Sequence, residues 1–370
     1  MTEIRPYRKG GDCGGTIAML NTAMLFPAGS NAALTTLLTV AVGAVGAALA
    51  QALNVPAWVL LGPALAVSLA GLGGWHLGVA DPLRDICFVI LGLGVGAGFD
   101  SQVGAVLLRW PLAFLVLAVA LVVTMVMCRL VLMRGFGFDS RSASLASAPG
   151  HLSFVLGLAM DLHGDVARIT VVQSIRLLFL TVSVPFIARA MGYDFTEMSL
   201  GGGAPMEIST MLVLAALAAI VGLLFRRFRF PAPLLLGAMT VSAIGHASEL
   251  TPGAIPSAML TPAFLVLGTL IGTRFAGIGR IQLLGTLPAG LAVTLVSVLV
   301  ACLAALPVAA ALQMPAAHVL TAFAPGGLET MIALGAAMGA SPGFVAACHV
   351  ARLMLLLVLI PLFLTRRGRA

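Results

Sequence analysis

Two similar stretches of sequence decide the fold of this chain: SASLASAPGHLSFVLGLAMDLHG at residues 142–164 and HVLTAFAPGGLETMIALGAAMG at residues 318–339. Each holds an Ala-Pro-Gly within a run of apolar residues. Proline lacks a backbone N–H and clashes with the preceding turn, so this tripeptide interrupts a helix. Either arm is shorter than the ~20 residues that a helix needs to span a bilayer. Each stretch is therefore either a re-entrant hairpin or one broken helix that crosses, and both alternatives stay open.

The composition of the whole chain places these stretches in a membrane protein. Of 370 residues, 60% are hydrophobic and only 9% are charged, with a mean hydropathy of +1.11. An average soluble chain carries roughly 25% charged residues. Apolar runs recur along nearly the whole sequence, without the alternating pattern of a membrane barrel. We therefore expect an all-α polytopic membrane protein, in which every spanning backbone satisfies its own hydrogen bonds.

The chain consists of two similar halves. Prolines, glycines and an arginine of the first half coincide with the same residue types in the second half when the numbering is shifted by 176. The coinciding pairs include Phe88 and Phe264, Gly92 and Gly268, Gly96 and Gly272, Pro149 and Pro325, Gly150 and Gly326, Arg176 and Arg352, and Pro185 and Pro361. Apolar composition alone would not produce this register. We therefore predict two duplicated structural repeats.

Each half is expected to contain six elements. In the first half they are roughly 34–53, 55–73, 84–100, 110–132, an interrupted segment 140–164, and 168–190. In the second half they are roughly 209–226, 232–248, 260–277, 284–307, an interrupted segment 315–340, and 343–364. The predicted domain order is a tail at 1–30, the first repeat at 31–190, a linker at 191–208, the second repeat at 209–365 and a terminus at 366–370.

The basic residues predict how the halves lie in the membrane. If the interrupted segments do not cross, most of the 20 basic residues share one side and the acidic linker lies opposite. If they cross, the cluster of Arg226, Arg227 and Arg229 moves outside, against the cytoplasmic bias of basic loops. We therefore predict ten crossings in an inner membrane, cytoplasmic termini and an extracytoplasmic linker, with the two repeats inverted. The same sides result if the interrupted segments cross and the short helix 55–73 does not.

The two breaks are the first candidate for a substrate site. Secondary transporters often build such sites from broken helices of inverted repeats. The freed N–H and C=O groups need partners, and helix N-termini favour anionic groups. The candidate substrate-binding residues at the breaks are Pro149, Gly150, Pro325, Gly326 and Gly327. The alternative is that the breaks serve packing and bind no ligand.

An arginine lies near the middle of the last helix of each half, at Arg176 and Arg352. An arginine at the centre of a bilayer costs about 3 kcal/mol on insertion scales, so both need compensation. They are predicted to bind an anionic substrate, in bidentate fashion if it is a carboxylate, or to satisfy free carbonyls of the adjacent interrupted segment. The two roles are compatible. Gln173 and His349 precede the arginines by one helical turn and extend a polar strip.

Glu329 follows the second Ala-Pro-Gly and has no acidic counterpart, because Ser153 occupies the equivalent position. It falls in the first turn of the second arm, where a carboxylate suits a helix N-terminus. We predict that it couples a proton or a cation to transport. The alternative is that it serves as a helix cap.

Other classes of function are disfavoured. The six histidines are scattered, so we expect neither a copper or iron site nor enzymatic activity, and no cofactor. The basic residues lie at the ends of apolar segments without interleaved aromatic residues, so we expect no nucleic-acid binding. The five cysteines are odd in number and lie mostly inside apolar runs, so no disulfide framework is predicted.

The interrupted segments, each followed by an apolar helix with a central arginine, resemble those of the AbrB-like duplicated membrane protein family. The match is best at APGGLETM, residues 324–331, whereas APGHLSFV, residues 148–155, departs at His151. The resemblance covers about residues 34–365. It implies a fold distantly similar to secondary transporters with five-helix inverted repeats. Family members are labelled as ammonia monooxygenases or as regulators of gene expression.

These features predict a secondary transporter that moves a small solute by alternating access. The solute is hypothesised to be anionic, and the bilayer and a coupling proton or cation are the other expected partners. The alternative is a membrane protein that does not transport and that influences the regulation of gene expression indirectly.

Overall fold

The computed structural model describes residues 32–99, 110–150, 152–193, 200, 204–228 and 230–365. In the first half the described helices are α2 (Ala32–Ala52), α3 (Trp58–Leu72), α4 (Asp81–Gly96), α6 (Pro111–Gly135), α7 (Ser140–Ser147), α8 (Leu152–Asp161) and α9 (Val166–Ala190). In the second half they are α10 (Ile208–Arg227), α11 (Pro233–Ala247), α12 (Ser257–Gly272), the 3-10 helix η1 (Thr273–Phe275), α13 (Arg280–Leu312), α14 (Ala316–Phe323), α15 (Leu328–Ala337) and α16 (Pro342–Thr365).

The architecture is that of an all-α polytopic membrane protein, as predicted. Within the described part of the chain, 7 helices are long and apolar enough to cross a membrane: α2, α6, α9, α10, α12 together with η1, α13 and α16. The helices α3 and α11 are apolar but have only 15 residues each. The predicted tail 1–30, the terminus 366–370 and much of the linker 191–208 lie outside the described residues.

The predicted elements match the observed helices within a few residues, except for α13. This helix runs for 33 residues from Arg280 to Leu312, although 284–307 was expected. The prediction ended at Pro307, which lies inside the helix. Proline removes one helical hydrogen bond, but the apolar run continues beyond it, and a membrane helix tolerates an internal proline when its surroundings compensate.

The helices of the two halves have matching bounds. The bounds of α4, α7 and α8 shifted by 176 are those of α12, α14 and α15, and the bounds of α3 shifted by 175 are those of α11. This agreement supports the predicted duplication. The opposite orientation of the repeats in a membrane stays a prediction.

A close helix contact occurs twice at related positions. A Cβ atom at Gly92 of α4 would collide with the carbonyl oxygen of Leu235 in α11, and one at Gly268 of α12 would collide with that of Leu60 in α3. Glycine is required because the backbones approach too closely for any side chain. The third helix of each half therefore packs on the second helix of the other half.

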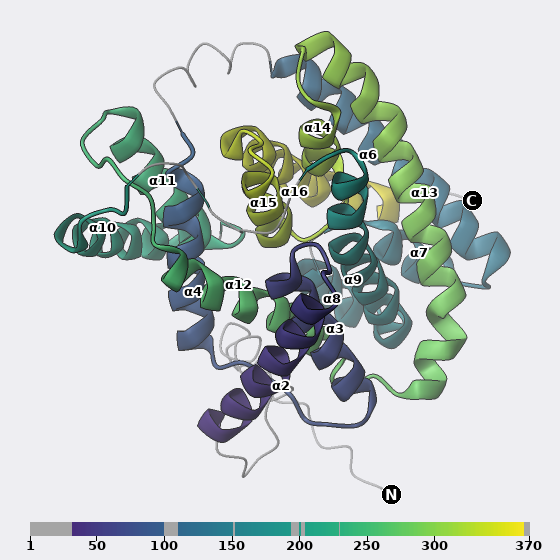
Figure 1. Cartoon of the computed structure of the whole chain (residues 1–370). Helices are drawn as coiled ribbons and strands as arrows, with labels where there is room; N and C mark the ends of the chain where they lie inside the picture. Colours follow the sequence, from purple (N-terminus) through teal and green to yellow (C-terminus); the bar gives the residue numbers. More distant parts are fainter. Residues whose placement is uncertain are drawn as a thin grey trace, which may run out of the picture.

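The described helices form two groups, each drawn from both halves (Figure 1). The six-helix group consists of α2, α3, α4, α10, α11 and α12, together with the short η1 that follows α12, and the hairpin group consists of α6 to α9 and α13 to α16. The main contacts between the groups run from α9 to α3, α12 and η1, and from α15 to α4. Two bodies with limited mutual contact are a common arrangement for rigid-body motion.

Both interrupted segments are hairpins. In the first, the backbone N–H of Asp165, after α8, donates to Oγ of Ser142 in α7 at 2.9 Å. In the second, Nε2 of His318 in α14 lies 3.1 Å from the carbonyl oxygen of Met338, after α15. The start and the end of each segment therefore lie side by side, and the chain reverses at its break. This geometry selects the hairpin over the single broken helix.

Asp139 begins the first hairpin. Its carboxylate accepts hydrogen bonds from the backbone N–H groups of Arg141 and Ser142, both at 3.0 Å, and so caps α7. Partial burial acts to raise the pKa of Asp139, but the hydrogen bonds from Ser142 and Arg141 outweigh it and hold the pKa below its ordinary value. The cap therefore stays charged, and effective, at neutral pH.

Candidate functional site

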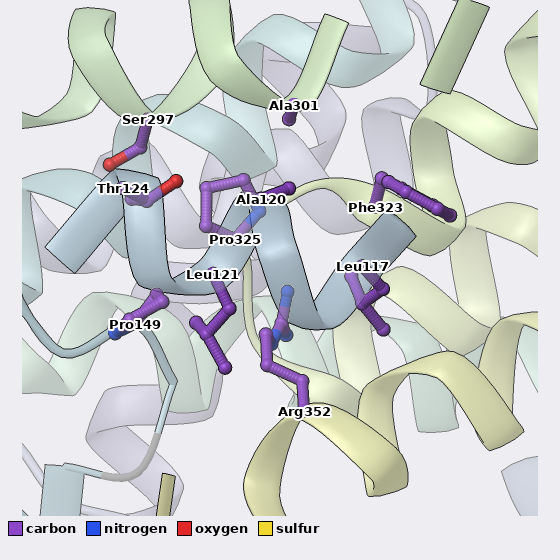
Figure 2. Close-up of a pocket in the computed structure, with 10 residues that line it drawn as sticks. All are labelled: Leu117, Ala120, Leu121, Thr124, Pro149, Ser297, Ala301, Phe323, Pro325 and Arg352. Carbon is purple, nitrogen blue, oxygen red and sulfur yellow. The ribbon is translucent and has the colours of Figure 1, made fainter. Parts of the chain in front are cut away.

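The tips of the two hairpins meet inside the hairpin group. Pro149 of the first tip and Pro325 of the second both line a small cavity, together with Arg352 of α16 (Figure 2). Gly150 adopts a φ of +108°, which glycine tolerates and other residues rarely adopt. A Cβ atom at Gly150 would lie 3.5 Å from Nη2 and 3.6 Å from Nε of Arg352. Arg352 thus lies against both tips.

Arg352 is held by the second hairpin. It is only 2% exposed. Its Nη1 donates to the carbonyl oxygen of Ala324 at 2.6 Å, and its Nη2 donates to that of Gly326 at 3.1 Å. Both carbonyls lie at the break between α14 and α15, where neither accepts a hydrogen bond from a helical N–H group. The remaining donor, Nε, is buried and has no partner among the described residues.

Arg176 is held by the first hairpin in a related way. Its Nη2 donates to the carbonyl oxygen of Ala148 at 2.9 Å and to Oε1 of Gln173. Gln173 in turn donates from Nε2 to the carbonyl oxygens of Ala148 at 2.8 Å and Leu145 at 3.3 Å. Nη1 of Arg176 is buried without a partner in the described structure.

The two arginines therefore contact equivalent carbonyls. Ala148 is the C-cap of α7 and Ala324 is the C-cap of α14. A cation at a helix C-terminus interacts favourably with the helix dipole and with its free carbonyls. This arrangement corresponds to the carbonyl-satisfying role that the sequence suggested, and it leaves one donor of each guanidinium free.

Neither guanidinium pairs with a carboxylate from the described residues. The ion pairs described join Arg84 to Asp81 and Asp85, and Arg226 to Asp85, at the start of α4. A buried charge that is only partly compensated by neutral groups is expensive. The place where the hairpins meet therefore carries excess positive charge.

The cavity beside Arg352 is small and mostly apolar. Its volume is about 20 Å³, which is room for a water-sized guest. It is lined by Leu117, Ala120, Leu121 and Thr124 of α6, Ser297 and Ala301 of α13, Phe323 of α14, Arg352, and the two tip prolines Pro149 and Pro325. Figure 2 shows the guanidinium of Arg352 pointing from α16 toward Pro325, with Leu121 beside it.

Two hydroxyl groups complete the lining. Ser297 donates to the carbonyl oxygen of Val293 at 2.7 Å and lies 3.5 Å from Sγ of Cys128. Thr124 lines the cavity and forms no hydrogen bond with any described residue. Neither residue could be singled out from the sequence, because hydroxyl side chains in apolar helices commonly bond to their own backbone.

The structure places His349 and Glu329 outside the cavity lining. His349 is fully buried, and its Nδ1 lies 2.9 Å from the carbonyl oxygen of Val345, while its Nε2 has no partner among the described residues. Glu329 makes no capping hydrogen bond with α15, whose N-cap is Gly327. Its carboxylate instead lies within electrostatic range of Arg274 in η1, across the boundary between the two groups.

The residues singled out by sequence are therefore only partly assembled into one place. Pro149, Gly150, Pro325, Gly326 and Arg352 meet at the tips. Arg176 and Gln173 stand behind the first tip. Gly327 contacts Leu177 of α9, and His349 and Glu329 lie apart. Within the described part of the chain, no three histidine, cysteine or acidic residues lie together in a way that would hold a metal ion.

Comparison with known proteins gives three matches. The model of the family described as "Transition state regulatory protein AbrB" matches residues 58–367, which include both hairpins and both arginines. The chain is 27% identical over 334 residues to "Uncharacterized protein YhjN" of Bacillus subtilis (strain 168), covering 83% of this chain and 82% of that protein. It is 25% identical over 321 residues to "Putative regulator AbrB" of Escherichia coli (strain K12), covering 83% and 89%.

Proposed function

The chain belongs to the AbrB family, and from this premise we propose that it is a secondary transporter that moves a small anionic solute by alternating access. The observation that carries the proposal is the pair of buried guanidiniums, Arg176 and Arg352. Each is anchored to the tip of its own hairpin, and each keeps one donor without a partner in the described structure. An anion at the tips would balance the positive charge of both arginines and accept hydrogen bonds from Arg352, which lines the cavity.

The arrangement of the helices supports transport. The hairpin group contains the broken segments of both halves, and the six-helix group touches it mainly through α9 and α15. In secondary transporters, one such body rocks against the other around a fixed central site. The cavity of about 20 Å³ is too small for most metabolites, so we take this arrangement as a closed state that widens to admit the solute.

The predicted topology belongs to the same proposal. Because the interrupted segments are hairpins, each half retains five other elements. Seven of these ten are long and apolar enough to cross, and the proposal of ten crossings adds the shorter helices α3, α4 and α11. We propose an inner-membrane protein with both termini in the cytoplasm, as the distribution of basic residues favours. The absence of enzymatic activity and of nucleic-acid binding is proposed on the scattered histidines and the terminal positions of the basic residues.

Coupling to a proton or a cation is proposed at Glu329. This carboxylate is partly buried at the start of α15, opposite Arg274 of the other group. A charge at a moving boundary can exchange its partner between two states of a transporter, so a proton or a cation that competes with Arg274 would bias the motion.

The transport proposal is tested with purified protein in proteoliposomes. Currents are recorded on a solid-supported membrane for gradients of acetate, nitrate, chloride, sulfate and phosphate. Uptake of the labelled anions is measured in parallel and counts equally, because a monoanion that enters with a proton carries no net charge. We expect protein-dependent current for at least one anion, lost in Arg176→Ala and in Arg352→Ala. Arg189→Ala, an exposed arginine of α9 that bonds to Asn54, is the matched control and keeps the current. Lysine variants at 176 and 352 replace the alanine variants if these do not fold.

The outcome that overturns the arginine assignment is direct. If both alanine variants fold and carry the same current as the unaltered protein, the guanidiniums are not part of the transport site. If no anion produces a current and none raises the melting temperature, the proposal of an anion transporter is wrong.

A membrane protein that acts on gene regulation without transport is the second candidate. The name of the Escherichia coli relative, a regulator, favours it. This candidate predicts no ligand-induced rise in melting temperature across the anion panel, whereas a transporter is stabilised by its substrate. It also predicts that the Arg352→Ala variant restores normal expression patterns in a deletion strain.

A further inference from the structure

We propose that the cavity at the hairpin tips binds a short monocarboxylate, held by the Nε–Nη2 edge of Arg352 and by the hydroxyl of Thr124. The inference rests on the proposed function, because the cavity is the substrate site of the proposed transporter. To that function it adds the chemical class of the anion and a binding residue, Thr124, which could not be identified from the sequence.

The free edge of Arg352 matches a carboxylate. Nη1 and Nη2 donate to the carbonyls of Ala324 and Gly326, while Nε has no partner in the described structure. Nη2 carries a second N–H, and Nε and Nη2 lie on one side of the planar group. Two parallel N–H groups in this geometry bind the two oxygens of a carboxylate.

The first tip contacts this edge of Arg352 through Gly150. The Cβ position of Gly150 lies 3.5 Å from Nη2 and 3.6 Å from Nε of Arg352, so it faces the same edge. A side chain there would occupy the approach to both donors. Glycine at this position leaves the edge without a covering side chain, so a carboxylate can reach it when the tips separate from the closed arrangement.

Thr124 supplies a further donor from the opposite wall. Its neighbour in the lining, Ser297, already donates to Val293 of its own helix at 2.7 Å. The hydroxyl of Thr124 makes no such bond with any residue that the structure describes. It is therefore available to donate to a carboxylate oxygen.

The charge and the walls favour a monoanion with an apolar body. Of the two guanidiniums, only Arg352 lines the cavity, since Arg176 stands behind the first tip. Sulfate and phosphate have four oxygens and up to two charges, and these few donors would leave several oxygens unpaired and dehydrated. The remaining walls, from Leu117 and Leu121 to Phe323, are apolar and suit a short hydrocarbon chain.

The test measures melting temperature in detergent as a function of anion concentration. The probes are the potassium salts of acetate, propionate, chloride, nitrate, sulfate and phosphate, at matched ionic strength. We expect acetate or propionate to raise the melting temperature in a saturable way and the other four to have no saturable effect. In Thr124→Val the apparent affinity for the monocarboxylate falls about tenfold, as expected for the loss of a hydrogen bond to a charged group.

Thr240→Val is the matched control. Thr240 lies on α11 in the six-helix group and donates to Leu236 of its own helix at 2.8 Å, so this variant keeps the affinity of the unaltered protein. Arg352→Lys keeps the charge but not the fork, and it too loses the saturable effect. A Thr124→Val variant whose melting temperature without ligand equals that of the Thr240→Val variant excludes a folding defect.

Every other outcome of this experiment contradicts a specific part of the proposal. Equal stabilisation by sulfate or phosphate overturns the monocarboxylate and leaves the proposed anion transporter standing. Equal stabilisation by chloride overturns the fork and its carboxylate. Equal stabilisation by nitrate, a planar monoanion that fits the same fork, overturns the selectivity for a carboxylate with an apolar body. An unchanged affinity in Thr124→Val removes Thr124 from the site. Absence of any saturable effect, together with absence of current, overturns the proposed function itself.

Discussion

Single residues explain how two arginines are kept inside a membrane protein. Arg176 donates to the C-cap carbonyl of Ala148, and Arg352 donates to that of Ala324. The break in each hairpin leaves this carbonyl without a helical donor, and the buried arginine supplies the missing hydrogen bond. They differ in their helpers. Arg176 has Gln173 as an acceptor, whereas the equivalent His349 turns to Val345. The arginine without a side-chain helper is the one that lines the cavity.

Gln173 is therefore predicted to stabilise the first hairpin. In Gln173→Met the buried carbonyls of Ala148 and Leu145 lose a donor and Arg176 loses an acceptor, so the free energy of unfolding falls by about 1–3 kcal/mol. The measurement is thermal unfolding in detergent. Gln51→Met, at an exposed position on α2, is the control and stays within about 0.5 kcal/mol. Equal melting temperatures for the two variants would show that the network adds no stability.

Sequence reasoning reached the arginines but not the threonine. An equivalent pair of arginines in two apolar helices is conspicuous, because each charge needs compensation. Nothing in the sequence singles out Thr124, because a threonine in a membrane helix commonly donates a hydrogen bond to the backbone of its own helix. Only the packing of α6 against both tips distinguishes it from threonines such as Thr240, which donates to Leu236.

At the scale of elements, the two hairpins are closed by contacts between residues far apart in sequence. An Ala-Pro-Gly shows where a helix stops but not where the chain goes next, so the sequence left a hairpin and a crossing helix equally open. The direction is determined by a contact at the open end of each hairpin, Ser142 to Asp165 and His318 to Met338. Neither pair belongs to a sequence motif from which the contact could have been predicted.

Ser142 is predicted to hold the first hairpin closed. In Ser142→Ala the partly buried hydrogen bond from the N–H of Asp165 is lost, which costs about 0.5–1.5 kcal/mol. Faster hydrogen exchange at the amide of Asp165 and a lower melting temperature are the expected signs. Ser144→Ala is the control, because Ser144 donates only to Ser140 of its own helix at 2.7 Å. Unchanged exchange at Asp165 in Ser142→Ala would contradict the role of this contact.

At the scale of the whole molecule, the two halves of the chain contribute to the two groups in the same way. Each half contributes its first three described α-helices to the six-helix group, η1 with them, and its remaining α-helices to the hairpin group. The paired contacts of Gly92 with Leu235 and of Gly268 with Leu60 interlock the halves within the first group. Across the boundary between the groups, the close glycine contacts described, Gly98 with Pro342 and Gly343 with Phe99, meet side chains and not backbone. Few elements touch across this boundary, so it is where motion is expected.

Glu329 and Arg274 carry opposite charges across that boundary, and we predict that they are coupled. In a double-mutant cycle of Glu329→Gln and Arg274→Gln, the effects on unfolding free energy are non-additive by about 0.2–1 kcal/mol, the range for partly exposed pairs. The control cycle combines Glu329→Gln with Arg226→Gln, because Arg226 lies 3.6 Å from Asp85 instead, and it is additive.

The same variants connect this contact to transport. If the groups move against each other, the pair separates in one of the two states, so removing either charge shifts the population between the states. Both single variants are therefore expected to change the initial rate of anion uptake in proteoliposomes, and the double variant to match a single one. Additive effects on uptake, or rates equal to that of the unaltered protein, would place the moving boundary elsewhere.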